Sequence, residues 1–540
     1  MNAPTMFQTP LAKTGKYASG VLLTIIAASL AAPLAAVLFS LTDPVGDSIT
    51  FVFRTRAAEY VSGTVLLCLL TGGIAGLLGI STALLVALCE FPLRRTLSAA
   101  LALPLAVPPY IAAYAYGDLL SPFGPIASTI EALTGADVSA AMPDIRNLPG
   151  AAVILALTLF PYVYLAARAS FAARSFTMIE AARTLGASPI QAALRILAPS
   201  ARPAIAGGLA LVLMETAADF GVADYFGVST LSIGIFRTWY GFGDLTAASQ
   251  LAAMLFFFAM ILVLMEEAGR RGRVSEAARV QRKFTRFVLR GPTAIGAGAF
   301  CLFVVLAGFL APLFLLISKL NAVDTGIALR SLLQTTGNTG FIASTGAVLI
   351  ITLSILLTYT ARAANSRLVR FILRVATLGY AVPGAVIAVG ILSLLAGAGK
   401  MATQDAAVVT GIGALLFAYA SRFTTIGYNT IAAGLEQIDP SIDAAARTLG
   451  SSTTKLIARI HLPLLSKALA SASIVVFVDI TKELPATLIL RSFNFETLAT
   501  KVYRLAGDER LTEAAPHALL LIAVGLIPIL ILNRLGDRAS

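Results

Sequence analysis

Four carboxylates interrupt two segments that are otherwise apolar enough to lie inside a membrane. The first segment reads LVLMETAADFGVADYF and contains Glu215 and Asp219; the second reads VVFVDITKELPATLIL and contains Asp479 and Glu483. Burying an ionisable side chain in a bilayer is costly, so such residues are candidates for function. Carboxylate oxygens are ligands for hard, highly charged metal ions, and they also attract organic cations. The four acids are therefore candidates for a substrate pathway.

The two acidic pairs are related by one offset, since adding 264 to 215 and 219 gives 479 and 483. Each pair is spaced i, i+4, so a continuous helix would place both acids on one face. Two such helices could present four carboxylates to a central interface. Alternatively, Lys482 and hydroxyl groups on neighbouring helices satisfy the acids as part of the fold. We favour this second interpretation for Asp219 and Glu483 and leave Glu215 and Asp479 open.

The composition requires a membrane around these acids. The 540 residues are 58% hydrophobic and 13% charged, with a mean hydropathy of +0.85, whereas about a quarter of residues are charged in soluble domains. Apolar runs of roughly 20 residues recur and lack the alternation of barrel strands. The sequence therefore predicts an all-α membrane protein with about twelve transmembrane helices, near residues 18–40, 61–88, 97–117, 150–170, 203–226, 247–266, 293–318, 340–360, 371–395, 406–428, 465–490 and 515–533.

The basic residues predict the orientation of these spans. The linker 268–292 is strongly basic, and placing it in the cytoplasm puts most of the Lys and Arg residues on that side, with both termini cytoplasmic. Because these charges follow the topology and adjoin the spans, they indicate contact with lipid head groups rather than with nucleic acid. The opposite orientation would place the basic cluster outside, and we do not favour it.

The linker divides six spans from six. An even number of spans in each half predicts two pseudosymmetric halves, parallel to one another, with a pathway between them. The predicted parts are an N-terminal tail and first helix (1–60), the rest of the first half (61–267), the basic linker (268–292), a seventh helix with an external loop (293–339) and the rest of the second half (340–534).

One polar segment occurs once in each half. Residues 180–199 read EAARTLGASPIQAALRILAP, and residues 444–463 read AAARTLGSSTTKLIARIHLP. Good helix formers precede Gly186 and Gly450, where glycine can adopt the left-handed conformation that ends a helix. Ser452 is then suited to cap a second helix. Gene duplication explains the identity of the two copies, but a shared cytosolic partner better explains why the loops kept it while the spans diverged.

This segment resembles the EAA loop of binding-protein-dependent ABC importer permeases, in which the loop docks into a groove on the ATP-hydrolysing subunit. The second copy has Ala444 where the family has Glu, and Asp443 one residue earlier, so docking there could be weaker or could use the shifted acid. By this resemblance the docking positions are Glu180, Ala181, Ala182, Arg183 and Gly186 in one half and Ala445, Ala446, Arg447 and Gly450 in the other.

The resemblance also implies the partners. The chain has no GxxxxGK[ST] phosphate loop, so we expect no catalytic residues and no bound cofactor, and we expect ATP to be used by a separate subunit. The implied assembly has two copies of that ATPase on the cytoplasmic face and a periplasmic substrate-binding protein, in a bacterial inner membrane. The fold implied is that of a fused, two-half type I importer permease.

Three longer phrases indicate the substrate. Residues 102–120, 214–244 and 482–505 resemble fused permeases of ferric-iron importers. We expect no stable metal site, but a transient Fe(III) contact at Glu215 and Asp479. Thiamine or another small cation is the alternative within the class. An ion-gradient-driven secondary transporter is the alternative from another class, and it would not need two EAA loops.

Overall fold

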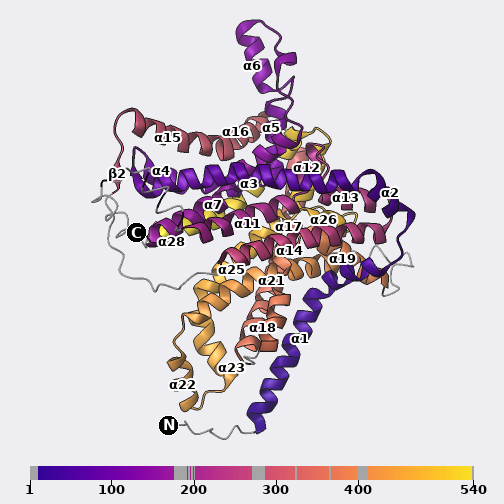
Figure 1. Ribbon diagram of the computed structural model, residues 1–540, viewed down its shortest axis with the longest axis vertical. Coiled ribbons are helices and arrows are strands. Elements are labelled where there is room, and N and C mark those ends of the chain that lie inside the picture. Colours follow the sequence, from indigo (N-terminus) through magenta and orange to yellow (C-terminus); the bar gives the residue numbers. More distant parts are fainter. Residues whose placement is uncertain are drawn as a thin grey trace. The chain divides into compact units, whose positions relative to one another are not determined.

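The computed structural model shows a chain built almost entirely of helices (Figure 1). It describes residues 10–174, 201–270, 286–322, 325–363, 367–397 and 411–537, together with residues 186, 191, 195 and 199. Within these residues the strands are β1 (Cys89–Glu90) and β2 (Phe287–Val288), which form one short parallel pair. Helices satisfy every backbone group within one segment, which is why apolar runs adopt them in lipid.

Seven helices of the described chain are long and apolar enough to cross a membrane, and up to ten spans result if each of three bent helix pairs counts as one. The predicted all-α membrane protein is thereby confirmed. Two of the twelve predicted spans, near 203–226 and 406–428, overlap α11 (Arg202–Ala218) and α21 (Ile412–Glu436). These two helices are not among the ten candidate spans, which are selected by helix length, hydropathy and number of charged residues.

The chain forms two compact units, and each combines segments distant in sequence. Unit 1 comprises residues 1–43 and 336–497, and unit 2 comprises residues 44–335 and 498–540. Unit 1 contains α1 (Pro10–Phe39), η1 (Ser40–Thr42), most of α17 (Thr325–Ala363), α18 (Arg367–Ala376), η8 (Gly379–Ala381), α19 (Gly384–Gly397), α21, α22 (Pro440–Thr448), α23 (Thr453–Leu456), η9 (Ile457–His461), α24 (Leu462–Leu464), α25 (Ser466–Lys482) and α26 (Pro485–Leu490).

Unit 2 contains both strands and the start of α17. Its other elements are α2 (Asp47–Thr55), α3 (Ala57–Leu88), α4 (Arg94–Ala100), η2 (Leu103–Ala106), α5 (Pro109–Leu119), α6 (Pro125–Thr134), η3 (Ser139–Ala141), α7 (Leu148–Arg174), α11, α12 (Gly221–Tyr225), α13 (Leu231–Phe236), η5 (Arg237–Gly241), α14 (Leu245–Arg270), α15 (Pro292–Val305), η6 (Leu306–Leu310), α16 (Ala311–Lys319), η7 (Leu320–Ala322), α27 (Leu498–Gly507) and α28 (Leu511–Asp537). In Figure 1, α6 extends away from the rest of this unit.

Close helix packing in unit 2 depends on glycine. A Cβ atom added to Gly79 on α3 would lie 2.7 Å from the Cβ atom of Val163 on α7, and one added to Gly208 on α11 would lie 2.9 Å from the Val163 Cα atom. Membrane helices associate through such close backbone approach, because lipid provides little hydrophobic force between them. The three helices therefore form the tightly packed centre of this unit.

Unit 1 is organised around the first helix of the chain. Helix α1 packs against α18 and α19, beside which it lies in Figure 1. A Cβ atom added to Gly390 on α19 would collide with the Pro33 carbonyl of α1. The first helix is therefore an integral part of a unit whose other elements follow residue 335.

Proline residues lie at sharp bends in two spans. The chain turns by 93° between the segment ending at Ala106 and α5, next to Pro108 and Pro109. It turns by 114° between the segment ending at Ala381 and α19, next to Pro383. Proline lacks an N–H group and clashes with the preceding helical turn, so it favours a break at these positions.

Candidate functional site

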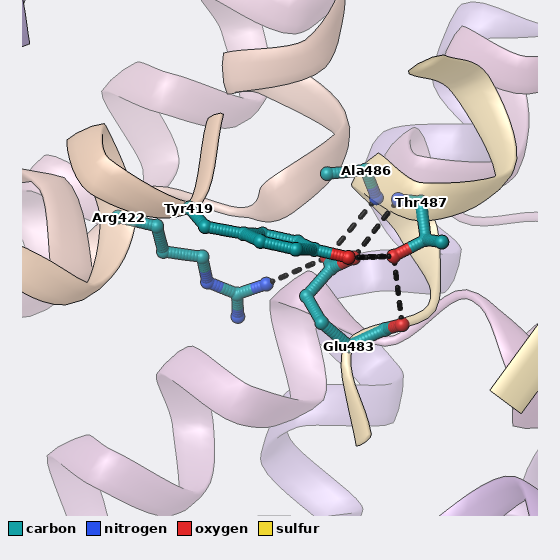
Figure 2. A network of polar contacts seen from close by, with 5 residues as sticks. All are labelled: Tyr419, Arg422, Glu483, Ala486 and Thr487. Atoms are coloured by element: carbon teal, nitrogen blue, oxygen red, sulfur yellow. Dashed lines mark hydrogen bonds and ion pairs between the residues drawn. The ribbon is translucent and has the colours of Figure 1, made fainter. Parts of the chain in front are cut away.

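Glu483 lies at a break between two helices of unit 1. Helix α25 ends at Lys482, Glu483 is extended (φ −66°, ψ 124°), and α26 begins at Pro485. The Glu483 carboxylate accepts hydrogen bonds from the backbone N–H groups of Ala486 (3.0 Å) and Thr487 (2.9 Å) and from the Thr487 hydroxyl (2.7 Å; Figure 2). The acid therefore satisfies amide groups that the start of α26 would otherwise leave unpaired.

Arg422 on α21 neutralises this buried acid. Its Nη1 atom lies 3.1 Å from Glu483 Oε1, and the two side chains are 12% and 1% exposed. Tyr419, one turn earlier on α21, shares a 2.7 Å hydroxyl hydrogen bond with Thr487 (Figure 2). These contacts tie α21 to α26. They give Glu483 a structural role, and its role in a substrate pathway stays a prediction.

Asp219 occupies the equivalent break in unit 2. Its backbone is also extended (φ −64°, ψ 135°), and its Oδ2 atom accepts hydrogen bonds from the N–H groups of Val222 (3.1 Å) and Ala223 (3.0 Å) in α12. The prediction of a continuous helix carrying both acids of a pair on one face is therefore wrong. Helices α11 and α25 end one residue before the second acid, because that acid caps the helix that follows.

The two breaks differ in charge compensation. Subtracting the offset of 264 from 422 gives position 158, which is Thr158, and its buried hydroxyl donates to the carbonyl of Ile154 on its own helix (3.1 Å). Among the residues that the structure describes, Asp219 has no ion pair. The break in unit 1 therefore has a fixed cation, whereas the described part of unit 2 supplies none to Asp219.

Glu215 and Asp479 lie on α11 and α25, and both are half-buried. Glu215 is close enough to Asp219 for their charges to repel each other. No group of three or more His, Cys, Asp or Glu side chains that could hold a metal occurs among the described residues. The transient Fe(III) contact at Glu215 and Asp479 stays a prediction.

The second copy of the repeated segment has the predicted shape. Helix α22 ends at Thr448, Gly450 is left-handed (φ +77°), and the Ser451 N–H group donates to the Ala446 carbonyl (2.9 Å). Such a bond is typical of a glycine-terminated helix. The predicted cap at Ser452 is also confirmed, because its hydroxyl accepts the Lys455 N–H group (3.4 Å). In Figure 1, α22 and α23 lie at the lower end of unit 1.

The predicted docking positions are only partly described. Ala445 is exposed and Ala446 is buried, while Glu180, Ala181, Ala182, Arg183 and the Arg447 side chain lie outside the described residues. Gly186 is exposed and left-handed (φ +80°), as Gly450 is, so the predicted glycine turn is confirmed in both copies. Their docking role is untested.

Asp443, the shifted acid of the second copy, is bound inside unit 1. Its carboxylate lies 2.6 Å from Arg362 Nη2 on α17 and 2.7 Å from His461 Nε2 on η9. The His461 ring stacks on Tyr359 of α17, with centroids 5.6 Å apart. Asp443 therefore joins α22 to two other elements instead of projecting from the surface.

Sequence reasoning missed Arg422 and the partners of Asp443. Arg422 lies in the apolar run 406–428, so the rule that identified the intramembrane acids would also have identified this cation. Arg362 lies 81 positions from Asp443, and no local pattern connects them.

Comparison with known proteins is consistent with this architecture. Residues 350–539 match the family model described as "Binding-protein-dependent transport system inner membrane component". The Fe(3+)-transport system permease protein FbpB 2 of Haemophilus influenzae is 25% identical over 525 residues, covering 95% of this chain and 97% of that protein. The ferric transport system permease protein FbpB of Actinobacillus pleuropneumoniae is 26% identical over 65% of this chain and 53% of its own length.

A shorter relative is named for a different substrate. The sulfate transport system permease protein CysT of Salmonella typhimurium is 27% identical over 36% of this chain and 72% of its own length. Residues 350–539 of this chain therefore resemble the binding-protein-dependent transport permeases, and the described part of the chain has several helices long and apolar enough to cross a membrane.

Proposed function

We propose that this chain is the membrane subunit of an ATP-driven importer that carries ferric iron across a bacterial inner membrane. One observation supports this substrate above the others, namely the similarity to an Fe(3+)-transport permease over 95% of this chain and 97% of that protein. The sulfate permease covers only 36% of this chain. The similarity to the Fe(3+)-transport permease extends over both units, so it covers the residues of the substrate pathway wherever they lie. A match to about a third of the chain does not.

The repeated segment supports a pair of motor subunits. Two left-handed turns, at Gly186 and Gly450, each present an exposed glycine after the same A-A-R-T-L string. We infer that each turn contacts one copy of an ABC ATPase on the cytoplasmic side, where both termini also lie. The permease itself hydrolyses no ATP, and a periplasmic binding protein delivers the iron.

The half-buried acids Glu215 and Asp479 suit a cationic cargo. Carboxylate oxygens can replace part of the water shell of Fe(III) during passage without forming a stable site. Sulfate, the substrate in the name of the shorter relative, would be repelled by ionised carboxylates. The proposed pathway therefore favours a metal cation over an anion.

Co-purification and uptake test this proposal. The tagged chain is isolated from its native membranes, its associated subunits are identified, and the complex is reconstituted with the associated binding protein. We expect an ATPase subunit in the complex and ATP-dependent uptake of radiolabelled iron, with little uptake of sulfate or thiamine. ATP-dependent sulfate uptake without iron uptake would refute the substrate. Full transport by the isolated chain, driven by an ion gradient, would refute the importer itself.

A further inference from the structure

A second polar cluster in unit 2 lies beside Asp219. Helix α5 packs against α12 and also contacts α27, and the three elements contribute Tyr114, Asp224 and Tyr503. The Tyr503 ring lies 5.6 Å from the ring of Phe220, which directly follows Asp219. Residues from three helices, almost 400 positions apart in sequence, are thus brought to one place.

Tyr503 and Asp224 are in direct contact. The Tyr503 hydroxyl donates a hydrogen bond to Asp224 Oδ2 at 2.7 Å. Asp224 is exposed and Tyr503 is half-buried, so the pair can be reached from outside the unit. A phenol that is hydrogen-bonded to a carboxylate places two oxygen atoms side by side. Once the phenol has lost its proton, both oxygens can bind a metal ion.

Tyr114 has a buried hydroxyl that no described residue satisfies. The residue is 2% exposed, and its hydroxyl has no hydrogen-bond partner among the described residues. The centre of its ring lies 4.6 Å from the centre of the Tyr225 ring, and Tyr225 directly follows Asp224 in the sequence. Tyr114 also interacts electrostatically with Tyr503, Asp224 and Asp219. Leaving a buried polar group unpaired costs about 1–3 kcal/mol, so this hydroxyl is a candidate to contact a ligand.

The described residues provide no cation to these acids. Neither Asp219 nor Asp224 has an ion pair in the part of the chain that the structure describes. The nearby Arg146 is directed elsewhere: it donates to the Tyr225 hydroxyl (3.0 Å), its guanidinium carbon lies 4.7 Å from the centre of the Tyr225 ring, and it lies 3.7 Å from Glu509. At the corresponding break of unit 1, Arg422 fills this role for Glu483.

We infer that Asp219, Asp224, Tyr114 and Tyr503 form a binding site for a hard trivalent metal cation, and that ferric iron contacts it during transport. This inference rests on the proposed function and names a position for its substrate. Carboxylate and phenolate oxygens are hard ligands. Binding breaks the O–H bonds of the phenols and forms Fe–O bonds without a change in oxidation state, and the released protons pass to water at the exposed Asp224.

The second half of the sequence lacks this set of ligands. The Val-Pro pair that precedes α5 at positions 107 and 108 recurs before α19 at positions 382 and 383, so Tyr114 corresponds to Val389. With the offset of 264, Asp224 corresponds to Leu488. The proposed site therefore belongs to unit 2, in which the acid at the helix break has no arginine among the described residues.

Visible spectroscopy tests the site without transport. Ferric nitrilotriacetate is titrated into the purified full-length chain in lipid nanodiscs. We expect a visible phenolate-to-iron charge-transfer band that saturates at one iron per chain. Tyr503→Phe and Tyr114→Phe should weaken the band, Asp224→Asn should raise the apparent Kd about tenfold or more, and the matched control Tyr428→Phe, on α21 of unit 1, should leave the band unchanged.

The experiments distinguish failure of the proposed metal site from failure of the proposed function. Tyrosine to phenylalanine removes one oxygen and keeps the ring, and monodispersity of each variant is measured first. A band that survives both tyrosine substitutions, or no band in the wild-type chain, would overturn the site. If the wild-type complex still takes up iron in that case, the proposed function stands and only the site is refuted. If the complex transports sulfate alone, the function fails whatever the spectrum shows.

Discussion

Arg422 and Glu483 show how a buried charge in a membrane protein is stabilised. Glu483 is 1% exposed in its side chain and uses both carboxylate oxygens on backbone amides, a hydroxyl and a guanidinium group. Removing one member of such a pair leaves the other charge buried and uncompensated, whereas removing both avoids that penalty. Breaking this pair should therefore cost more stability than removing both of its members.

Arg422→Met should lower the free energy of unfolding by about 3–5 kcal/mol, because it leaves Glu483 ionised without a partner. The double variant Arg422→Met, Glu483→Gln should recover much of this loss, since glutamine can still accept the amide hydrogen bonds of α26. Denaturant unfolding of the detergent-solubilised chain measures both variants. Equal losses in the single and double variants would contradict this account.

The paired variant Glu215→Gln, Asp479→Asn should impair iron uptake and leave the assembly with the ATPase intact. These acids are half-buried and lie one turn before the helix breaks, so loss of their charge should weaken contact with a cation while the packing is preserved. Uptake by reconstituted complexes and the ATPase content of the preparations are measured together. Normal uptake would assign both acids to the fold alone.

At the scale of single residues, sequence reasoning identified the acids and not their surroundings. Local composition marks Asp219 and Glu483 as unusual, but the structural interpretation named Lys482 and hydroxyls on neighbouring helices. In the structure, backbone N–H groups of the following helix bind both acids. Their chemical difference could not be predicted, because Arg422 lies 61 positions from Glu483 and is brought to it only by packing of α21. The unpaired hydroxyl of Tyr114 has no sequence signal.

The turn after α22 fixes the shape of the repeated segment. Gly450 has φ +77° and Gly186 has φ +80°, a conformation that costs an L-residue with a Cβ atom roughly 1–2 kcal/mol. Both glycines have open space where a Cβ atom would lie. Backbone strain is therefore the main cost of substitution at these positions.

Gly450→Ala should weaken association with the ATPase, because the strained turn would shift the start of the second helix. Gly450→Asn is the matched control, since asparagine tolerates the left-handed region better than alanine and should retain more of the association. The yield of ATPase in affinity purification of the tagged chain measures the effect. If alanine and asparagine reduce the yield equally, the side chain and not the backbone is responsible.

The two copies of the segment should contribute unequally to docking. The second copy has Ala444 in place of Glu180, and its shifted acid, Asp443, is bound to Arg362 and His461. Glu180→Ala should therefore reduce ATPase association more than a neutral surface substitution, and adding Ala444→Glu should restore part of it. The same purification assay measures this, and equal association in all variants would show that the acid has no role in docking.

At the scale of elements, the proline bends were predictable and the acid breaks were not. Pro108, Pro109 and Pro383 lie at the bends, and proline cannot continue a helix. The i, i+4 spacing predicts one helical face, whereas the helices end before Asp219 and Glu483. Pro485 could have revealed the second break, since proline favours the first turn of a new helix.

The two units show that this chain cannot be divided at its linker without consequence. Unit 1 takes α1 from the start of the sequence, and unit 2 takes α27 and α28 from its end. The sequence repeat predicts two halves divided at the linker. The compact units instead combine segments from both sides of the linker, and the repeat does not reveal this packing.

Residues 281–540, expressed alone, should accumulate poorly, because α18 and α19 would lack their α1 partner. Co-expression of residues 1–280 should restore a stable complex of the two fragments. Quantitative immunoblots of membrane fractions measure both conditions. Stable, monodisperse 281–540 without the other fragment would contradict this expectation.

The packing of α1 also sets the order of events during biosynthesis. Its partner α19 begins more than 300 residues later in the chain. Because translation adds about 5–20 residues per second, α19 is synthesised roughly 15 seconds to more than a minute after α1. During that interval the face of α1 that packs against α19 lacks this partner. Unit 1 can therefore complete its packing only after α19 has been synthesised.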